Sequence, residues 1–147
     1  MKALLSAIKT ALQESEDLDY VRDADVFITE NELLIPESLV FPAIGIKDGP
    51  ISYAVATQSQ ENDTLRVKVI PYVQLAKPEA AIMGDESAEL KGILDVAADI
   101  RGILKSNRLD GIVDSAWPES ETESEILAGE EIEGIQMKII SMRYERY

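Results

Sequence analysis

Carboxylates are the side chains through which this sequence could do chemistry, because its other reactive groups are few. The 147-residue chain contains 28 Asp and Glu residues but no His and no Cys. Without His the commonest general base is missing, and without Cys no thiolate can act as a nucleophile or bind a metal. No GxxxxGKS/T or GxGxxG sequence is present to cradle a phosphate. What remains is a pair of carboxylates, or carboxylates that bind Mg²⁺ or Ca²⁺.

Three groups of carboxylates lie close together in the sequence, and each has a simpler structural interpretation. The acids at 85–89 fall where a helix is expected to begin, with Asp85 as its N-cap, and acids are stabilising at that end. Asp95 and Asp99 are four residues apart on the polar side of the same helix, which predicts a solvated face. The run Glu119–Glu133 has seven Glu and no base, but it lacks the ligand spacing and central Gly of a Ca²⁺ loop. We therefore expect no catalytic residue, no metal and no cofactor.

Two amphipathic helices and several strands must then position the polar groups. Apolar residues spaced by threes and fours predict helices over 2–15 and 86–106. Alternating or short continuous apolar runs predict strands over 21–28, 41–46, 51–57, 65–75 and 135–147. The segment from 29 to 41 is expected to be a loop, because Pro36 lies in its middle.

Three local signals refine this pattern. Asp48-Gly49-Pro50 predicts a tight turn between two hairpin strands. Pro71 interrupts the clearest strand, which predicts an edge position or a bulge there. The last strand changes its apolar face near Ile140, which indicates a bulge or an end that is covered on both sides, such as by a neighbouring subunit.

The order of these elements predicts an α+β fold. Runs of strands flanked by single helices favour a mostly antiparallel β-sheet with two helices packed on one face. The other face of the sheet would be solvated or joined to partners. We see no repeat and no linker, so we expect a single domain over 1–147.

The charge of the chain limits its partners. Its formal net charge is −14, and its 14 bases are scattered. Affinity for nucleic acid and for anionic membrane surfaces comes largely from basic clusters, so we expect neither partner. No signal peptide and no run of about 20 apolar residues is present, so we expect synthesis as a soluble cytoplasmic chain.

A few residues are candidates for a protein interface. Trp117, the only Trp, either covers a sheet edge or lies in a subunit contact, where Trp and Arg are enriched. The terminal aromatic and basic residues form either a frayed strand end or a contact that meets acidic neighbours. The predicted interface residues are Trp117, Glu121, Glu123, Glu125, Arg143, Tyr144 and Arg146.

The order of elements resembles the tail-terminator and minor-tail-protein families of tailed phages, typified by the lambda tail terminator. The resemblance rests on the helix at Met1–Leu12, the strand entry Phe41-Pro42-Ala43-Ile44, the strand Val67–Val73, the helix Leu90–Leu104 and the final strand Ile135–Tyr144. These features span nearly the whole chain, although the acidic run after Trp117 does not match the family pattern.

The resemblance implies a structural, non-catalytic virion protein of the tail or neck. Such a protein forms a ring, expected to be hexameric, that ends the tail tube and meets the head connector. Its partners would be other copies of itself, tail-tube proteins and head-connector proteins. Two other functions stay open from the residues alone: an acidic adaptor that binds a basic protein in the cell, and a carboxylate-dependent metalloenzyme.

Overall fold

A computed structural model describes residues 1–57, 60–127 and 134–147 of the chain, and it shows an α+β fold. The helices are α1 (Lys2–Glu14), α2 (Pro78–Met83) and α3 (Ile93–Leu104). The strands are β1 (Val26–Ile28), β2 (Ala43–Thr57), β3 (Gln60–Gln74), β4 (Ser115–Glu121), β5 (Glu125–Ile126), β6 (Ile135–Met137) and β7 (Ile140–Arg146). The described part of the chain thus contains both predicted helices and the predicted sheet.

The long strand β3 is the centre of a mixed sheet. On one side it pairs with β2, which is antiparallel, and the short β1 then pairs with β2 in parallel. On its other side β3 pairs with two antiparallel strands in turn, β7 along its first half and β6 at its end. The strands β4 and β5 lie outside β7 and β6 respectively. The prediction of a mostly antiparallel sheet is confirmed.

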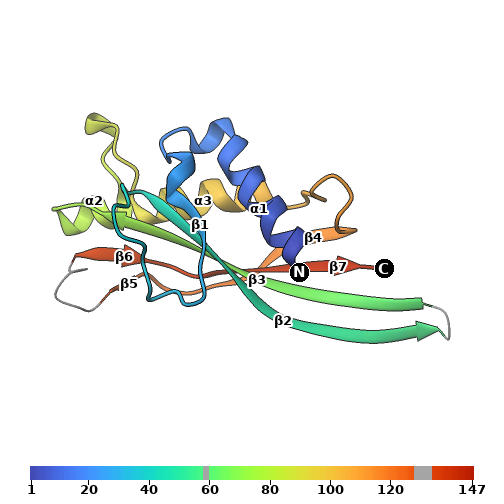
Figure 1. The fold of residues 1–147 in the computed structure, drawn as a ribbon. Helices are drawn as coiled ribbons and strands as arrows, with labels where there is room; N and C mark the ends of the chain where they lie inside the picture. The colour runs from blue at the N-terminus through green and yellow to red at the C-terminus, as the bar shows by residue number, and fades with distance from the viewer. Residues whose placement is uncertain (58–59, 128–133) are drawn as a thin grey trace.

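The helices cover one face of this sheet (Figure 1), as predicted. In α1 the residues Leu4, Ile8 and Leu12 are buried because their spacing places them on one side of the helix. They share the main core with apolar residues of α3 and of the strands, among them Ile100 and Val67. The term helical layer is used below for α1, α3 and the 3₁₀ turns at 16–18 and 23–25 that pack beside them.

The opposite face was expected to be solvated or joined to partners, but the chain itself covers part of it. A second core contains Ala43, Ile70, Tyr72, Leu127, Ile135 and Met137, and apolar residues of the 29–41 loop pack against it. The Tyr72 hydroxyl donates a hydrogen bond of 2.6 Å to the Glu32 carbonyl. The buried Asp25 carboxylate accepts the Val40 N–H at 3.1 Å and pairs with Arg22. These bonds hold the loop at both ends.

The last strand is two strands, β6 and β7, separated by Lys138 and Ile139. Both strands keep the same register against β3, with Met137 opposite Tyr72 and Ile140 opposite Val69, so the predicted bulge is absent. Ile135 and Met137 lie on one side in the second core, and Ile140 and Met142 lie on the other side in the main core, so the change of apolar face reflects two cores on opposite sides of the sheet.

Pro71 lies opposite this break in the middle of the sheet, so the prediction of an edge position is wrong. Its carbonyl accepts from the Lys138 N–H at 3.4 Å. A strand residue points its carbonyl and its nitrogen to the same side, so the proline nitrogen faces the gap between β6 and β7. Proline has no N–H, so the second bond of this pair is missing and the ladder is interrupted there.

The predicted turn at Asp48-Gly49-Pro50 is also wrong, because β2 continues straight through it. The pairing with β3 shifts between Asp48 and Ile51, which marks a bulge. At Gly49 an added Cβ would lie 2.6 Å from the Arg66 carbonyl oxygen, so glycine allows β3 to approach closely. The pairing of β2 with β3 continues instead as far as Thr57 and Gln60.

The second predicted helix begins later than expected, at Ile93. A 3₁₀ turn over Glu86–Ala88 precedes it, and Asp85 caps that turn rather than the helix. The segment before Ile93 is not helical, because Glu89 has a left-handed backbone with φ 55° and Leu90 forms a β-bridge with Asp85. Gly92 packs closely on Gly84 of the same chain, since an added Cβ would lie 2.4 Å from the Gly84 nitrogen. The predicted strand over 21–28 is likewise shorter, because a 3₁₀ turn occupies Asp23–Asp25.

Candidate assembly surfaces

The carboxylates that raised the question of catalysis have structural partners. Asp85 accepts the Ser87 N–H and hydroxyl, at 3.1 and 2.6 Å. Asp95 accepts the Gly92 N–H at the start of α3, and Asp99 accepts the Tyr20 hydroxyl at 2.6 Å. Among the described residues no group of three or more His, Cys, Asp or Glu side chains is placed to hold a metal ion.

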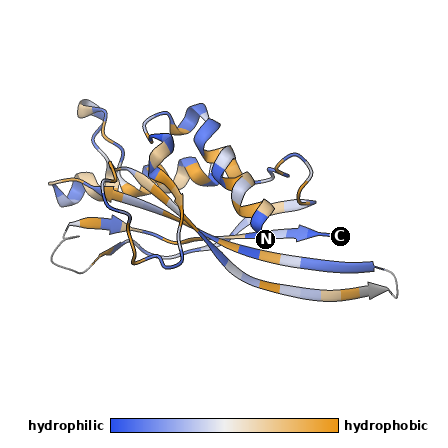
Figure 2. Cartoon of the chain, in the orientation of Figure 1, coloured by the Kyte–Doolittle hydropathy of each residue, from blue (hydrophilic) through white to orange (hydrophobic). Residues whose placement is uncertain are grey.

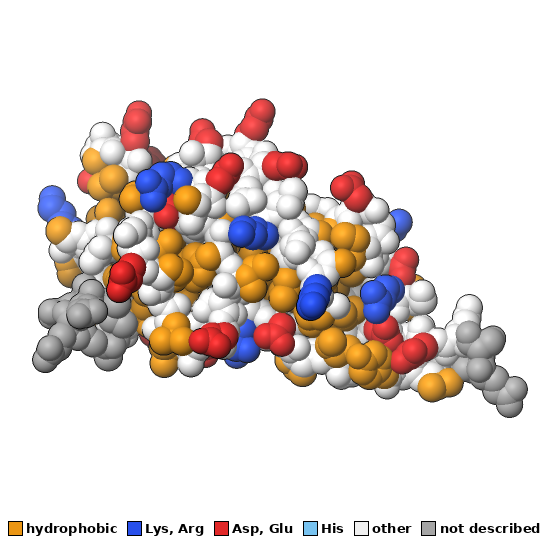
Figure 3. Space-filling model, viewed as in Figure 1, with side chains coloured by type: hydrophobic (Ala, Val, Ile, Leu, Met, Phe, Trp, Pro, Cys, Tyr) orange, Lys and Arg blue, Asp and Glu red, His pale blue; other side chains and the backbone are white. Residues whose placement is uncertain are grey.

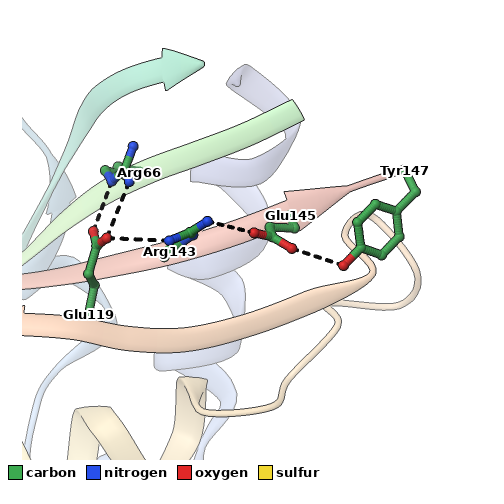
Figure 4. Close-up of polar contacts among 5 residues, drawn as sticks. All are labelled: Arg66, Glu119, Arg143, Glu145 and Tyr147. Carbon is green, nitrogen blue, oxygen red and sulfur yellow. Dashed lines mark hydrogen bonds and ion pairs between the residues drawn. The ribbon is translucent and has the colours of Figure 1, made fainter. Parts of the chain in front are cut away.

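A polar network lies on the sheet face that points away from the helices (Figure 4). Arg66 of β3 and Arg143 of β7 are directly opposite each other, and like charges in that arrangement are destabilising. Glu119 of β4 offsets them: it accepts two hydrogen bonds from Arg66, at 2.8 and 3.2 Å, and lies 3.7 Å from Arg143. The hydrogen bond from Arg66 holds the pKa of Glu119 below its ordinary value.

Two predicted interface residues, Trp117 and Arg143, belong to this network. The Arg143 guanidinium lies 5.4 Å from the centre of the Trp117 ring, within range of a cation–π contact. Arg143 also donates to Glu145 at 2.8 Å, and Glu145 accepts the Tyr147 hydroxyl at 2.9 Å. Trp117 is only partly exposed. The residues are thus adjacent on one face, as an interface would require, but they are already paired with each other.

The terminal aromatic and basic residues are hydrogen-bonded and paired within the sheet, so the prediction that they form a frayed strand end is wrong. Strand β7 extends to Arg146, which forms an ion pair of 3.0 Å with Asp63 of β3. The Tyr147 N–H donates to Asp114 at 2.7 Å. Tyr144 is completely buried in the main core, and it is therefore not part of the exposed surface.

Glu121 was predicted as a surface acid, but it binds two cations of its own chain. It accepts from Lys138 at 2.6 Å and pairs closely with Arg101. Burial acts to raise the pKa of Glu121, but the hydrogen bonds from Lys138 and Arg101 outweigh this effect and lower the pKa. Because only 7% of Lys138 is exposed, Glu121 supplies the charge that makes its burial tolerable. Its role in the folded chain is structural.

Glu123 and Glu125 are exposed, so they remain available to a partner. Glu125 lies in β5, at the edge of the sheet. The acidic run that begins at Glu119 continues into residues 128–133, which lie outside the described residues.

Charge is distributed unevenly over the two faces. The exposed acids Glu14, Glu16, Asp17, Asp19 and Asp23 follow one another along the helical layer, and acidic side chains line the top of Figure 3. The sheet face turned away from the helices instead carries Lys47 opposite Lys68 and Arg66 opposite Arg143. We call these four cations the basic strip. The basic strip was not predicted, because the sequence does not show which residues of different strands lie opposite one another.

A β-hairpin arm extends from the sheet past the helical layer (Figure 1). We define the arm as residues 51–55 of β2 and 60–63 of β3. Tyr53 and Val55 on it are 66% and 78% exposed. Figure 2 shows that the β2 half of the arm is pale to hydrophobic, whereas the β3 half is hydrophilic. The signal in the sequence was the uncharged run 49–60 in a chain that is 29% charged.

Other features of the surface are less distinctive. A groove of about 610 Å³ lies between α1 and the 107–112 loop, and small residues such as Ala3, Ser6 and Ala7 line it. A smaller apolar hollow of about 210 Å³ lies beside Tyr20 and Leu90. In the described part of the chain no helix is both long and apolar enough to span a membrane.

Comparison with known proteins gives a similarity of structure rather than of sequence. No protein-family model and no curated protein sequence matches the chain. The fold is similar to that of a chain described as "Virion of native gene transfer agent (GTA) particle", with a TM-score of 0.63 and 13% sequence identity. The match covers 97% of this chain and 92% of the other. At this identity the chain shares the fold of a virion component.

Proposed function

We propose that this chain is a structural protein of a tailed phage or phage-like particle, and that it serves as a tail-terminator or tail-completion subunit. The main support is the similarity of fold, over nearly the whole chain, to a chain of a gene transfer agent virion. The resemblance of the sequence pattern to tail terminators favours a position between the tail tube and the head connector. In that role the protein acts by binding its neighbours and needs no catalytic residue.

The proposed assembly is a closed ring of identical copies, six by the resemblance to tail terminators. A ring requires that one patch of each copy meets a different patch on the next. The exposed acids of the helical layer and the cations of the basic strip lie on opposite faces of the molecule, so a head-to-tail contact brings the two together, although Glu119 and Glu145 already offset Arg66 and Arg143. At the same time a net charge of −14 makes copies repel one another, so assembly should strengthen as salt screens that repulsion.

The ring is tested by the mass of the protein in solution. We would measure light scattering after size exclusion over a range of protein concentrations, from low to high salt. One copy has a mass of 16.2 kDa, so a discrete species of six times this mass that grows with salt would support the ring. Negative-stain electron microscopy of that species should show a closed annulus. A monomer at every concentration and salt would contradict a ring formed by the free chain.

The virion role is tested separately from the ring. Particles released by the strain that encodes this chain would be purified and labelled with gold-conjugated antibodies against it. Label at the junction of head and tail supports the proposal. Purified particles that lack the chain, as judged by mass spectrometry, would contradict a structural role in the virion.

A further inference from the structure

The arm extends the sheet beyond the helical layer, so the sheet face that the helices cover elsewhere is uncovered on the arm. Ile51 pairs with Leu65, whose side chain lies in the main core, so Ile51 faces the helical layer. Side chains alternate along a strand, and Tyr53 and Val55 therefore lie on the same face as Ile51. Ile51 still packs against the core, but Tyr53 and Val55 are mostly exposed to solvent. Val55 is the most exposed of the large apolar side chains in the described chain.

The arm also has an unpaired edge. Strand β1 pairs with β2 only at 44–46, so within the described residues no strand pairs with the outer side of β2 from Lys47 to Thr57. Proteins normally protect such edges with short strands, charges or proline. The other edges of this sheet follow that rule: β1 and β5 have three and two residues, and β4 carries Pro118 followed by Glu119 and Glu121. The β2 edge is long, and no charge follows Asp48 on it.

The charge of the chain indicates what covers the arm. A second copy of a protein with a net charge of −14 is repelled by most of the surface. On the arm, Asp63 and Glu61 of β3 lie opposite Tyr53 and Val55, and Asp63 is already paired with Arg146. The β2 edge itself carries no charge from Gly49 to Thr57, so a copy that pairs along this edge meets no acid of β2. A nucleic acid would instead require cations on the arm, and the described arm residues include none.

We propose that the arm is the self-association element of this protein, and that a second copy of the chain covers Tyr53, Val55 and the open edge of β2. This inference deepens the proposed function and rests on it, because it names the contact that links neighbouring copies of the ring. A stable interface uses about 20–30 residues a side, and the arm has fewer. Each copy in a ring both gives and receives one arm, so closing the ring doubles the contact per copy.

The test compares Val55→Glu with Met83→Glu. Both side chains are mostly exposed, at 78% and 64%, and both substitutions add the same charge, but Met83 lies at the end of α2, away from the arm. Val55→Ser removes the apolar group without adding charge. Circular dichroism should show an unchanged fold for all three variants. In sedimentation over a concentration series at high salt, we expect Val55→Glu and Val55→Ser to weaken association by about tenfold or more, and Met83→Glu to leave it near wild type.

A cysteine placed on the arm gives an independent readout. Ser52 is exposed on β2. Because the chain has no Cys, the variant Ser52→Cys carries a single thiol. The emission of a solvatochromic dye attached to that thiol should shift to shorter wavelengths when the otherwise wild-type protein associates. The dye should not shift in the background of Val55→Glu at the same concentration.

The outcomes separate this proposal from the proposed function. Equal association of wild type and Val55→Glu, with no dye shift, would overturn the role of the arm and leave the ring in place. Loss of association in Val55→Glu together with open-ended wild-type polymers would support the arm and contradict the ring. A wild-type chain that stays monomeric at high salt and concentration would overturn both.

Discussion

Replacement of Glu121 by alanine is the sharpest test of how the sheet is stabilised. The change leaves Lys138, whose side chain is 9% exposed, without its carboxylate partner. Removing one member of a buried ion pair costs about 3–5 kcal/mol, and we take the lower end, about 3 kcal/mol, because Glu121 retains contact with water. For a domain of this size each kcal/mol lowers Tm by about 2–4 °C, so Glu121→Ala should lower Tm by about 6–12 °C.

The companion variant removes both charges. In Glu121→Ala combined with Lys138→Met no charge remains buried, so most of the lost stability should return. Arg101 also loses a partner in both variants, but its side chain is 38% exposed and this loss should matter little. Glu123→Ala is the matched control, because that acid is exposed, and a change within about 0.5 kcal/mol is expected there.

The pH dependence has a definite sign. The pKa of Glu121 is lower in the folded chain than in the unfolded chain. The stabilisation is therefore present above the ordinary Glu pKa and is lost as the pH falls through the folded pKa. Urea unfolding followed by circular dichroism should show the full difference between wild type and Glu121→Ala at pH 7, and a smaller one below about pH 4. A loss below about 1 kcal/mol at pH 7, or no recovery in the double variant, would refute the ion-pair account.

Two further predictions concern buried polar groups, and both are measured by urea unfolding. Asp25→Ala should destabilise by about 2 kcal/mol, because the Val40 N–H and Arg22 lose their acceptor; since Arg22 lowers the pKa of Asp25, this difference should also shrink below about pH 4. Tyr144→Phe should be neutral or stabilising, because the buried hydroxyl has no partner among the described residues. Tyr72→Phe should lower the free energy of unfolding by about 1 kcal/mol, because its hydroxyl donates to the Glu32 carbonyl. Equal losses in the two tyrosine variants would contradict this difference between the two hydroxyls.

Local pattern was sufficient for much of the fold. The spacing of Leu4, Ile8 and Leu12 predicted α1 nearly to its end, because a helix with one apolar side can bury that side only against the sheet. The alternation along β3 placed Val67 and Val69 in the core correctly. The change of face near Ile140 was visible for the same reason, since side chains alternate along any strand.

Local pattern failed where a distant segment decided the backbone. Asp48-Gly49-Pro50 has the residues of a turn, but β3 approaches closely at Gly49 and draws the segment into a bulged strand. The predicted helix over 86–106 loses its first turns, where Asp85 and Leu90 form a β-bridge and Glu89 is left-handed. Leu94 lies off the buried side of the shortened helix and is 41% exposed.

The candidate site shows the same division. By itself the sequence determined the acidic charge, the absence of His and Cys, and the amphipathic elements, because these follow from composition and spacing. Only the tertiary structure decided that Tyr144 is buried, that Glu121 is bound by Lys138, and that residues 51–55 belong to an arm. Pairing between strands far apart in sequence sets which side chains meet and which face water, and no local pattern contains that register.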